Sequence, residues 1–444
     1  MTIAVRFAPS PTGRLHIGNA RTAVLNWLFA RKHKGRFFLR LDDTDATRCK
    51  EEYARAIIAD LAWLGLEPEA IRRQSERLDL HAAAARRLKA AGLLYPCYET
   101  EAELSLKRKA QRMAGRPPVY DRAALELDAA ARAAYEAQGR APHWRFRLPD
   151  TTISWHDAVR GKVSIDPGSI SDPVLVRADG SFLYTLPSVV DDMEMGITHV
   201  IRGEDHVVNT AVQIALTQAL GGEPPVHAHH SLLTAKDGGA LSKRLGSLGI
   251  GDFARRGLEP ETIVSYCATV GSARPVDVHP DMEELARGFE LSGLSRAPAR
   301  FDEKELETLN AKLLHAMPFE VAAPRLEKLG LAATPAFWEA VRGNLATLAD
   351  AAGWLDVIAG EIAPRKAPED AGFLRRAAAL LPPEPWDETT WKTWTRALKE
   401  ATGRKGKALF MPLREALTGR SRGPEMSRLL PLMGRRRALA RLEA

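Results

Sequence analysis

The stretch Arg6-Phe7-Ala8-Pro9-Ser10-Pro11-Thr12-Gly13-Arg14-Leu15-His16-Ile17-Gly18-Asn19 decides the fold. It begins as a short apolar strand, turns through residues rich in proline and glycine, and leads into a helix that opens near Asn19. A loop between a strand end and a helix start presents backbone N–H groups and the positive end of the helix dipole, which favour an anion such as phosphate. Gly18, which lacks a Cβ, would let a flat base or a phosphate lie against the main chain. Apolar side chains then recur on one helical face at Ala20, Val24, Trp27 and Leu28.

The whole chain sets broad limits on what the protein can be. Its 444 residues leave room for about two to four domains with a large buried core. No run of about 18 apolar residues occurs and the N-terminus lacks a signal segment, so we expect a cytoplasmic protein with no membrane association. The three cysteines, Cys49, Cys97 and Cys267, lie far apart, which argues against a disulfide framework.

The formal net charge of +7 suits a polyanionic partner, because arginine pairs with phosphate through two hydrogen bonds. The same charge can also serve solubility alone. Charge by itself therefore does not distinguish one kind of nucleic acid from another, or from the absence of such a partner.

Three carboxylates in four residues follow a second expected strand. The strand is Phe37–Leu41, and the segment Asp42-Asp43-Thr44-Asp45 stands at its end. Ligands of parallel α/β sheets bind beyond the carboxyl ends of the strands, so this segment and the first loop would open onto one crevice. Such carboxylates repel one another unless a cation or donor groups satisfy them. One or two of them can instead cap the helix that follows.

An arginine stands at the end of a further expected strand. Residues Ile197–His206 indicate a strand followed by a loop, and Val207–Leu220 indicate a helix. Arg202, facing the crevice, can bind a carboxylate as a two-pronged pair. The alternative is that Arg202 forms an ion pair with Glu204 or Asp205.

Glycines flank the segment Lys236–Ser247, which indicates a mobile loop with Lys243 and Arg244 at its tip. A mobile lysine that closes on a phosphate stabilises negative charge chiefly in the transition state. Taken alone, such a segment is more often an exposed loop.

The composition and pattern of the sequence change at two places. From His81 to about Gln138 the chain is rich in alanine, helical and charged, and Trp144–Leu148 then alternates apolar residues with Arg145 and Arg147. This alternation predicts a strand with one apolar and one basic face, whose arginines either contact phosphate or are solvated. Beyond about Gly271 the pattern becomes wholly helical, and it ends in a basic region.

Several segments resemble one family. Pro9–Asn19 resembles the HIGH loop of class I aminoacyl-tRNA synthetases, and Ala8–Gly13 has the form found in glutamyl-tRNA synthetases. Arg73–Arg77 and the block Tyr184–His206 also resemble segments of that family. Ala240–Arg244 resembles the KMSKS loop in its Leu-Ser-Lys-Arg form, with Ala240 in place of the first lysine. Gly406–Gly419 resembles the helical anticodon-binding domain of bacterial glutamyl-tRNA synthetases.

The resemblance covers essentially the whole chain and implies an α/β fold. A Rossmann-like catalytic domain would be split by an α+β insertion and followed by an all-α C-terminal anticodon-binding domain. The implied boundaries are 1–83 and 184–235 for the two catalytic halves, 84–183 for the acceptor-binding insertion, 236–312 for the loop and a helical stem-contact region, and 313–444 for the anticodon-binding domain.

The resemblance also implies an activity, ATP-dependent activation of L-glutamate followed by transfer of the glutamyl group to tRNA(Glu). The catalytic residues would be His16 and Lys243. ATP would be bound by Pro9, His16, Gly18, Asn19, Leu241, Ser242, Lys243 and Arg244. Glutamate would be bound by Arg6, Ala8, Ser10, Asp42, Tyr184, Ser188, Arg202 and His206, with Asp42 receiving the ammonium group.

Mg²⁺ would arrive with ATP, and we expect no metal held by the protein itself. Some relatives carry a zinc site in the insertion, but Cys97 has no second cysteine within ligand spacing, so we expect no zinc. We expect a monomer with tRNA(Glu) as its partner, and tRNA(Gln) is left open as a second substrate.

The chain departs from the family's usual residues at two positions in the expected glutamate site. Asp42 stands where the family most often has a glutamate, and Ser188 stands where relatives often have an asparagine. Two other functions stay open. One is a different adenylyl-transferring enzyme that shares the His-Ile-Gly loop, and the other is a non-catalytic tRNA-binding protein on the same scaffold.

Overall fold

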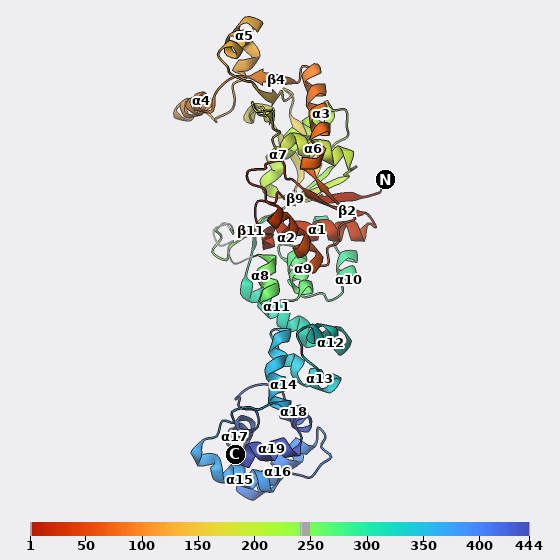
Figure 1. Cartoon of the computed structure of the whole chain (residues 1–444), viewed down its shortest axis with the longest axis vertical. Coiled ribbons are helices and arrows are strands. Elements are labelled where there is room, and N and C mark those ends of the chain that lie inside the picture. The colour runs from red at the N-terminus through yellow and green to blue at the C-terminus, as the bar shows by residue number, and fades with distance from the viewer. Residues whose placement is uncertain (1, 240, 242–248, 444) are drawn as a thin grey trace. The chain divides into compact units, whose positions relative to one another are not determined.

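The computed structural model describes residues 2–239, 241 and 249–443. The chain divides into two compact units (Figure 1). The N-terminal unit contains Met1–Phe253 and Ile263–Asp302, and the C-terminal unit contains Ala254–Thr262 and Glu303–Ala444. The first unit mixes helices and strands and the second is helical, which confirms the predicted fold class. None of the described helices is long and apolar enough to cross a membrane.

A parallel sheet organises the N-terminal unit. Strands β1 (Ala4–Phe7), β2 (Arg36–Leu41) and β3 (Ala70–Arg73) pair in that order, and β9 (His199–Gly203) pairs with β10 (Val226–His230). The two groups meet where Ala4 exchanges hydrogen bonds with Thr198, its N–H donating to Oγ1 and its carbonyl accepting from the N–H, each at 2.9 Å. The resulting order, β10-β9-β1-β2-β3, is that of a doubly wound sheet, and its ligands are expected beyond the carboxyl ends of the strands.

Helices cover this sheet. They are α1 (Ile17–Lys32), α2 (Glu51–Trp63), α6 (Thr185–Glu194) and α7 (Val207–Ala219). Helix α1 packs against β1, β2 and β9. It begins at Ile17 rather than near Asn19, because the His16 side chain caps it and Nδ1 accepts the Asn19 N–H at 3.3 Å. The expected apolar face is present, since Ala20, Val24, Trp27 and Leu28 are all buried.

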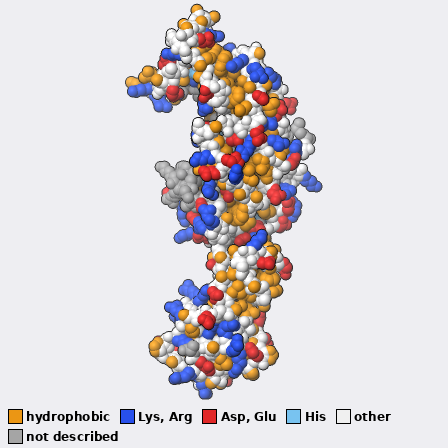
Figure 2. Space-filling model, in the orientation of Figure 1, with side chains coloured by type: hydrophobic (Ala, Val, Ile, Leu, Met, Phe, Trp, Pro, Cys, Tyr) orange, Lys and Arg blue, Asp and Glu red, His pale blue; other side chains and the backbone are white. Residues whose placement is uncertain are grey.

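An α+β segment interrupts this arrangement. It contains α3 (Leu78–Ala90), β4 (Leu94–Cys97), α4 (Glu101–Met113), α5 (Ala129–Ala137), β5 (His143–Phe146), the hairpin β6 (Ile153–Asp157) and β7 (Gly161–Ile165), and β8 (Val174–Val176), with short 3-10 helices at Gln74–Arg77, Ala123–Glu126 and Pro167–Ser169. Strands β4, β5 and β8 form an antiparallel sheet in that order. Figure 2 shows Lys and Arg side chains at the outer end of α4, which buries none of its residues.

The strand predicted over Trp144–Leu148 does not present the expected basic face. Arg145 is buried, donates from Nη1 to the Asp172 carbonyl at 2.7 Å, and lies 4.1 Å from the centre of the Tyr120 ring. Arg147 alone is exposed. The expectation that both arginines contact phosphate or solvent is therefore wrong for Arg145, because a cation enclosed by protein takes internal hydrogen-bond partners.

The remainder of the N-terminal unit follows the sheet. It includes β11 (Leu233–Thr234), α10 (Met282–Arg287) and β12 (Ala299–Arg300), with 3-10 turns at Glu204–His206 and Leu291–Gly293. Helices α8 (Ile250–Arg255) and α9 (Pro260–Thr269) belong to it except for residues Ala254–Thr262. The prediction of a wholly helical pattern beyond Gly271 is wrong at β12, whose Ala299 pairs in parallel with Leu233.

The C-terminal unit consists of helices. They are α11 (Glu303–Ala316), α12 (Phe319–Lys328), α13 (Pro335–Val341), α14 (Ala351–Ala359), α15 (Ala371–Ala379), α16 (Thr390–Thr402), α17 (Lys407–Thr418), α18 (Met426–Met433) and α19 (Arg435–Glu443), with 3-10 turns at Arg342–Asn344, Leu348–Asp350 and Pro368–Asp370. Arg441 of α19 is buried and donates to the carbonyls of Val357 at 2.5 Å and Leu417 at 2.7 Å. These carbonyls lie in the last turns of α14 and α17, where helices leave acceptors unpaired.

Strand β10 places three histidines, His227, His229 and His230, inside the N-terminal unit. Burial lowers the pKa of His227 to about 3 and that of His230 to about 3. Neither ring nitrogen of His227 has a hydrogen-bond partner among the described residues. These rings are therefore neutral in the folded state at neutral pH.

This burial predicts a fall in stability with acid. A histidine in the unfolded chain titrates near pH 6.5, whereas the buried rings stay neutral well below that pH. Between these two pKa values the unfolded chain therefore binds one more proton per buried ring than the folded chain. The free energy of unfolding then falls by about 1.4 kcal/mol for each such ring as the pH is lowered by one unit. His227→Leu should reduce the pH dependence of the unfolding free energy by about one proton between pH 6 and 4. The full-length protein is unfolded in urea, and hydrogen exchange at amides of the N-terminal unit reports the unfolding free energy of that unit. The exposed His156, changed to leucine, is the matched control, and an equal slope in the His227→Leu variant and the wild type would contradict the prediction.

Candidate active site

A cavity of about 970 Å³ opens at the carboxyl ends of β1 and β9, beside the start of α1. It is the place where a doubly wound sheet binds its ligands. The predicted site residues that line it are Arg6, Ala8, Pro9, Ser10, His16, Gly18, Asn19, Tyr184, Arg202, His206 and Leu241. The structure thus brings together residues from both halves of the interrupted sheet.

His16 stands at the start of α1 in a defined protonation state. Its Nδ1 accepts the Asn19 N–H, and burial lowers the pKa of His16, so the ring is neutral. The proton must then be on Nε2, which is left as a hydrogen-bond donor. Gly18 makes room for this ring, because a Cβ there would lie 3.1 Å from the His16 Cε1 and Nδ1 atoms.

Arg202 is a buried cation held by neutral acceptors. Its side chain is held by the Tyr184 hydroxyl (Nη1, 3.2 Å), Thr210 Oγ1 (Nη2, 2.6 Å), Gln213 Oε1 (Nη2, 2.7 Å) and His229 Nε2 (Nε, 3.3 Å). Only 5% of the residue is exposed, and no ion pair to it occurs in the described part of the chain. The alternative pairing with Glu204 or Asp205 is therefore not adopted; Glu204 pairs instead with Arg160. Burial lowers the pKa of Arg202, and the nearby positive charge of Arg6 lowers it further.

Arg6, by contrast, carries its own counter-charge. Its Nε and Nη2 donate to the two carboxylate oxygens of Asp192 at 3.0 and 3.2 Å. Asp192 also accepts from Arg40 at 2.6 Å, and Arg40 in turn holds Asp42 at 2.7 Å. Burial raises the pKa of Asp192, but Arg6 and Arg40 lower it more, so its pKa lies below the usual value. Two arginines and two carboxylates balance one another, with Arg6 at the cavity wall and Arg40, Asp42 and Asp192 behind it.

Two predicted glutamate-binding residues, Asp42 and Ser188, do not line the cavity. Asp42 is 5% exposed and gives both carboxylate oxygens to Arg40. Ser188 Oγ is fully buried and lies 3.3 Å from Arg40 Nη2 and 3.4 Å from Gln213 Nε2. Both residues thus support the arginines of the site from behind, because Arg40 contacts Asp192 and Gln213 contacts Arg202.

The other carboxylates of Asp42-Asp43-Thr44-Asp45 are also satisfied locally. Asp43 accepts from the N–H and hydroxyl of Ser75, each at 2.9 Å, and Asp45 accepts from the Thr47 hydroxyl at 2.7 Å. None of the three lines the cavity. Neighbouring donors from the protein thus satisfy these carboxylates in the structure.

The second predicted loop is described only at its margins. Leu241 lines the cavity, and Gly249 forms an isolated antiparallel bridge with His16. Ser242, Lys243 and Arg244 lie outside the described residues, as does Ala240. Their assignment to ATP stays a prediction.

Sequence reasoning missed several residues of the cavity wall. Arg21, Thr22 and His230 line it, and Arg21 donates to the carbonyls of Ser231 at 2.5 Å and Val270 at 3.0 Å. Thr22 could have been found from the sequence, because it follows Gly18 by one helical turn and shares its face. His230 could have been found as the last residue of a strand in a parallel sheet.

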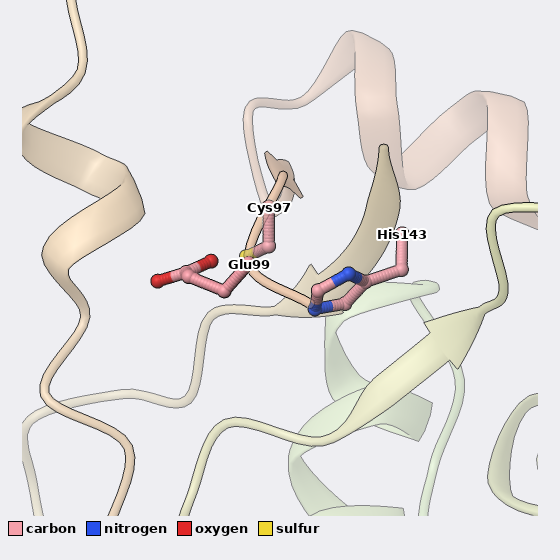
Figure 3. A group of neighbouring side chains, drawn as sticks. All are labelled: Cys97, Glu99 and His143. Atoms are coloured by element: carbon pink, nitrogen blue, oxygen red, sulfur yellow. The ribbon is translucent and has the colours of Figure 1, made fainter. Parts of the chain in front are cut away.

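Cys97, Glu99 and His143 form a cluster of donor atoms in the inserted segment (Figure 3), all within 4.8 Å of one another. Burial raises the pKa of the Cys97 thiol to about 11. The Tyr120 hydroxyl donates to Glu99 at 2.8 Å, and the Lys107 ammonium lies 3.6 Å from the same carboxylate. The cluster offers three ligands where a structural zinc site has four, and the expectation of no zinc stays a prediction.

Known proteins resemble this chain along its whole length. The family described as "tRNA synthetases class I (E and Q), catalytic domain" matches residues 2–308, and that described as "Anticodon binding domain" matches residues 312–444. Glutamate–tRNA ligase 2 of Methylobacterium sp. (strain 4-46) is 60% identical over 444 residues, which are 100% of this chain and 99% of that protein. Glutamate–tRNA ligase 1 of Brucella canis is 53% identical over 99% of this chain and 100% of its own length.

A solved structure agrees with these matches. The crystal structure of a glutamate tRNA ligase from Elizabethkingia meningosepticum in complex with its amino acid superimposes with a TM-score of 0.86 at 26% identity, covering 100% of this chain and 98% of that one. The resemblance noted in the sequence is thereby confirmed, and the chain belongs to the class I tRNA synthetases of the E and Q group.

Proposed function

We propose that this protein activates L-glutamate with ATP and transfers the glutamyl group to the 3′-terminal adenosine of tRNA(Glu). The observation that carries the proposal is the buried guanidinium of Arg202, which lies without an ion-pair partner among the described residues at the wall of the cavity that His16 and Gly18 also line. A guanidinium in this state favours a ligand carboxylate. The relatives named glutamate–tRNA ligase support the choice of glutamate.

The first step needs no nucleophile from the protein. A carboxylate oxygen of glutamate attacks the α-phosphorus of ATP, the bond to the pyrophosphate oxygen breaks, and glutamyl-adenylate and pyrophosphate result. The adenosine hydroxyl of tRNA then attacks the acyl carbon and releases AMP. The protein's contribution is to position the reactants and to stabilise the charge that develops.

The phosphates are assigned to the loop at the start of α1. The neutral His16 ring donates from Nε2 to a phosphate oxygen, and Gly18 offers backbone at the positive end of the helix. The Asn19 N–H is held by His16 Nδ1, so the assignment of Asn19 to ATP rests on its place in the cavity wall. We assign Pro9 and Leu241 to the nucleotide as well, since both line the cavity. Lys243, with Ser242 and Arg244, would stabilise the pentacoordinate phosphate, an assignment that rests on the sequence alone. Mg²⁺ would enter the site with ATP and would offset the negative charge of its phosphates.

The amino acid is assigned to the opposite part of the wall. Arg202 and Arg6 bind its carboxylates, Tyr184 holds Arg202 at 3.2 Å, and Ala8, Ser10 and His206 complete the pocket. Asp42 remains our candidate for the ammonium group. Because it lies behind the wall and pairs with Arg40, such a contact requires that pair to rearrange.

The helical residues 313–444 would bind the anticodon, and 84–183 the acceptor end, within the domain boundaries 1–83, 84–183, 184–235, 236–312 and 313–444. We propose that the protein works as a monomer in the cytoplasm. A different adenylyl-transferring enzyme or a non-catalytic tRNA-binding protein is disfavoured by the match to glutamate–tRNA ligases over the whole chain.

A charging assay tests the function and the choice of tRNA together. Purified tRNA(Glu) and tRNA(Gln) are incubated separately with the protein, ATP, Mg²⁺ and radiolabelled glutamate, with glutamine as the competing amino acid. We expect acid-precipitable glutamate on tRNA(Glu), because the site offers two guanidiniums for the two carboxylates of glutamate. Label on tRNA(Gln) as well would extend the substrate range. Tight tRNA binding without charging would contradict the proposal.

Arg202→Met should raise the KM for glutamate at least about 100-fold, because a charged hydrogen-bond pair to the substrate is lost and its buried acceptors are left unpaired. The KM for ATP should change less than about twofold. Both constants are measured by ATP–pyrophosphate exchange in the presence of tRNA. The exposed Arg177, changed to methionine, is the matched control, and equal losses for both substrates would remove Arg202 from the glutamate site.

Two variants separate the two roles of His16. His16→Asn keeps an oxygen that can cap α1, whereas His16→Ala does not, and both remove the Nε2 donor. We expect both to lower pyrophosphate exchange about 100-fold, while only His16→Ala loses about 1 kcal/mol of unfolding free energy. Wild-type exchange in His16→Asn would show that the histidine serves the helix alone.

A further inference from the structure

A buried aspartate–histidine pair contacts Arg202 without lining the cavity. Asp157 is the last residue of β6 in the inserted hairpin and is 1% exposed, and His229 on β10 is fully buried. The Asp157 Oδ2 atom lies 2.5 Å from His229 Nδ1. On the other side of the ring, His229 Nε2 lies 3.3 Å from Arg202 Nε. One imidazole therefore joins the hairpin to the arginine of the site.

The surroundings of Asp157 fix its ionisation. Its Oδ1 atom accepts the backbone N–H groups of Val159 at 3.0 Å, Arg160 at 2.9 Å and His229 at 3.1 Å. Burial raises the pKa of Asp157, but these donors and the His229 ring lower it more, so the pKa lies well below its usual value. The ionised carboxylate can only accept hydrogen bonds, so His229 Nδ1 must carry a proton.

The ring is neutral, and its tautomer follows. Burial lowers the pKa of His229, and the charge of Arg202 lowers it further, against the opposing effect of Asp157. A neutral ring with its proton on Nδ1 has a lone pair on Nε2. That lone pair faces Arg202 Nε–H, and Thr210 Oγ1, which lies 2.9 Å from Nε2, accepts Arg202 Nη2–H. In the other tautomer, with the proton on Nε2, the N–H groups of His229 Nε2 and Arg202 Nε would face each other.

We propose that Asp157 and His229 are positioning residues for the amino-acid substrate. Asp157 selects the imidazole tautomer whose Nε2 accepts from Arg202, and this contact holds the guanidinium in place for the substrate carboxylate. Neither residue touches the substrate. The inference rests on the proposed function, because it concerns the same arginine, and it gives the inserted hairpin an indirect part in the amino-acid site, through His229 and Arg202.

One substitution isolates the tautomer. Asp157→Asn keeps an oxygen for the three backbone N–H groups and replaces the other oxygen by an NH₂ donor. His229 Nδ1 must then accept, Nε2 takes the proton, and a donor faces Arg202. We expect the KM for glutamate to rise about tenfold, with the KM for ATP changed less than about twofold, in pyrophosphate exchange with tRNA present.

Asp166→Asn is the matched control for the hairpin. Asp166 is exposed next to β7 and its side chain accepts the Gly168 N–H at 2.9 Å, so the same chemical change is made at an aspartate that also holds backbone. We expect both KM values to remain within about twofold of the wild type. A tenfold rise in this control as well would overturn the inference, because hairpin stability would then explain the effect.

The same Asp157→Asn change, made in a His229→Gln variant, separates an effect on the position of Arg202 from an effect on the fold. His229→Gln offers an oxygen near the place of Nε2 but has no tautomer to select. We expect His229→Gln to retain more activity than His229→Leu. In the His229→Gln protein, the further change Asp157→Asn should raise the KM for glutamate less than about twofold. If Asp157→Asn costs the same tenfold in both backgrounds, Asp157 acts on the fold and the inference is overturned.

The tautomer is read directly by ¹⁵N NMR of the full-length, histidine-labelled protein. The His229 signals are assigned by their loss in His229→Gln. We expect protonated Nδ1 and bare Nε2 in the wild type, and the reverse in Asp157→Asn. A wild-type ring protonated on Nε2, or a reversal that leaves the KM for glutamate unchanged, would overturn the inference and leave the proposed function standing. Absence of glutamate-dependent exchange in the wild type would overturn the proposed function, whatever the tautomer.

Discussion

Arg202 keeps a positive charge inside the protein, with no ion pair to offset it among the described residues. Removing a guanidinium from water is costly, and a carboxylate beside it would be the usual compensation. Here the compensation comes from hydroxyl, amide, carbonyl and imidazole acceptors, which hold Nε, Nη1 and Nη2 of the guanidinium but leave its charge. The free energy that a counter-ion would supply thus remains available to a ligand. The rest of the site can be understood as the support of this one group.

The second arginine of the site, Arg6, has its charge balanced within the protein. Arg6 is paired with Asp192, and the pair continues through Arg40 to Asp42. This cluster is neutral overall, so it holds Arg6 rigidly at the wall without a strong demand for an anion. Arg202 and Arg6 therefore differ in what they can contribute: the first supplies attraction to a carboxylate, and the second supplies a fixed shape with a donor edge. Preorganised donors of both kinds lower the reorganisation needed when the substrate arrives.

Local pattern was enough to predict the main elements and the positions of Gly18 and Arg202, and the resemblance to a known family supplied most other predicted residues of the cavity wall. The period of α1, the short apolar strands and the strand-end position of Arg202 all follow from spacing and from the behaviour of parallel sheets. His16 was found as a site residue, although its capping of α1 was not, because a histidine is an uncommon cap.

What the sequence could not provide were partners far apart in the chain. The burial of Arg145 depends on Tyr120 and Asp172, and the place of Asp42 depends on Arg40, which points inward because Asp192 is there. Asp157 gave no signal, because it stands 72 residues before the histidine that it contacts. Such pairs are decided by tertiary packing, and pattern rules that work within a window of a few turns cannot find them.

The inserted segment leaves the sheet through α3 and returns through α6, and these two helices pack against each other. To the surrounding fold, everything between them is a single closed loop. The entropy of closing such a loop grows only with the logarithm of its length, by about 0.6 kcal/mol for each doubling. The length of this appendage can therefore change at little cost in loop entropy. Its inner part is still constrained, because Phe146, Leu175 and Val176 share a hydrophobic core with α6 and α7, and the tip of the hairpin must still offer a negative oxygen to the histidine beneath.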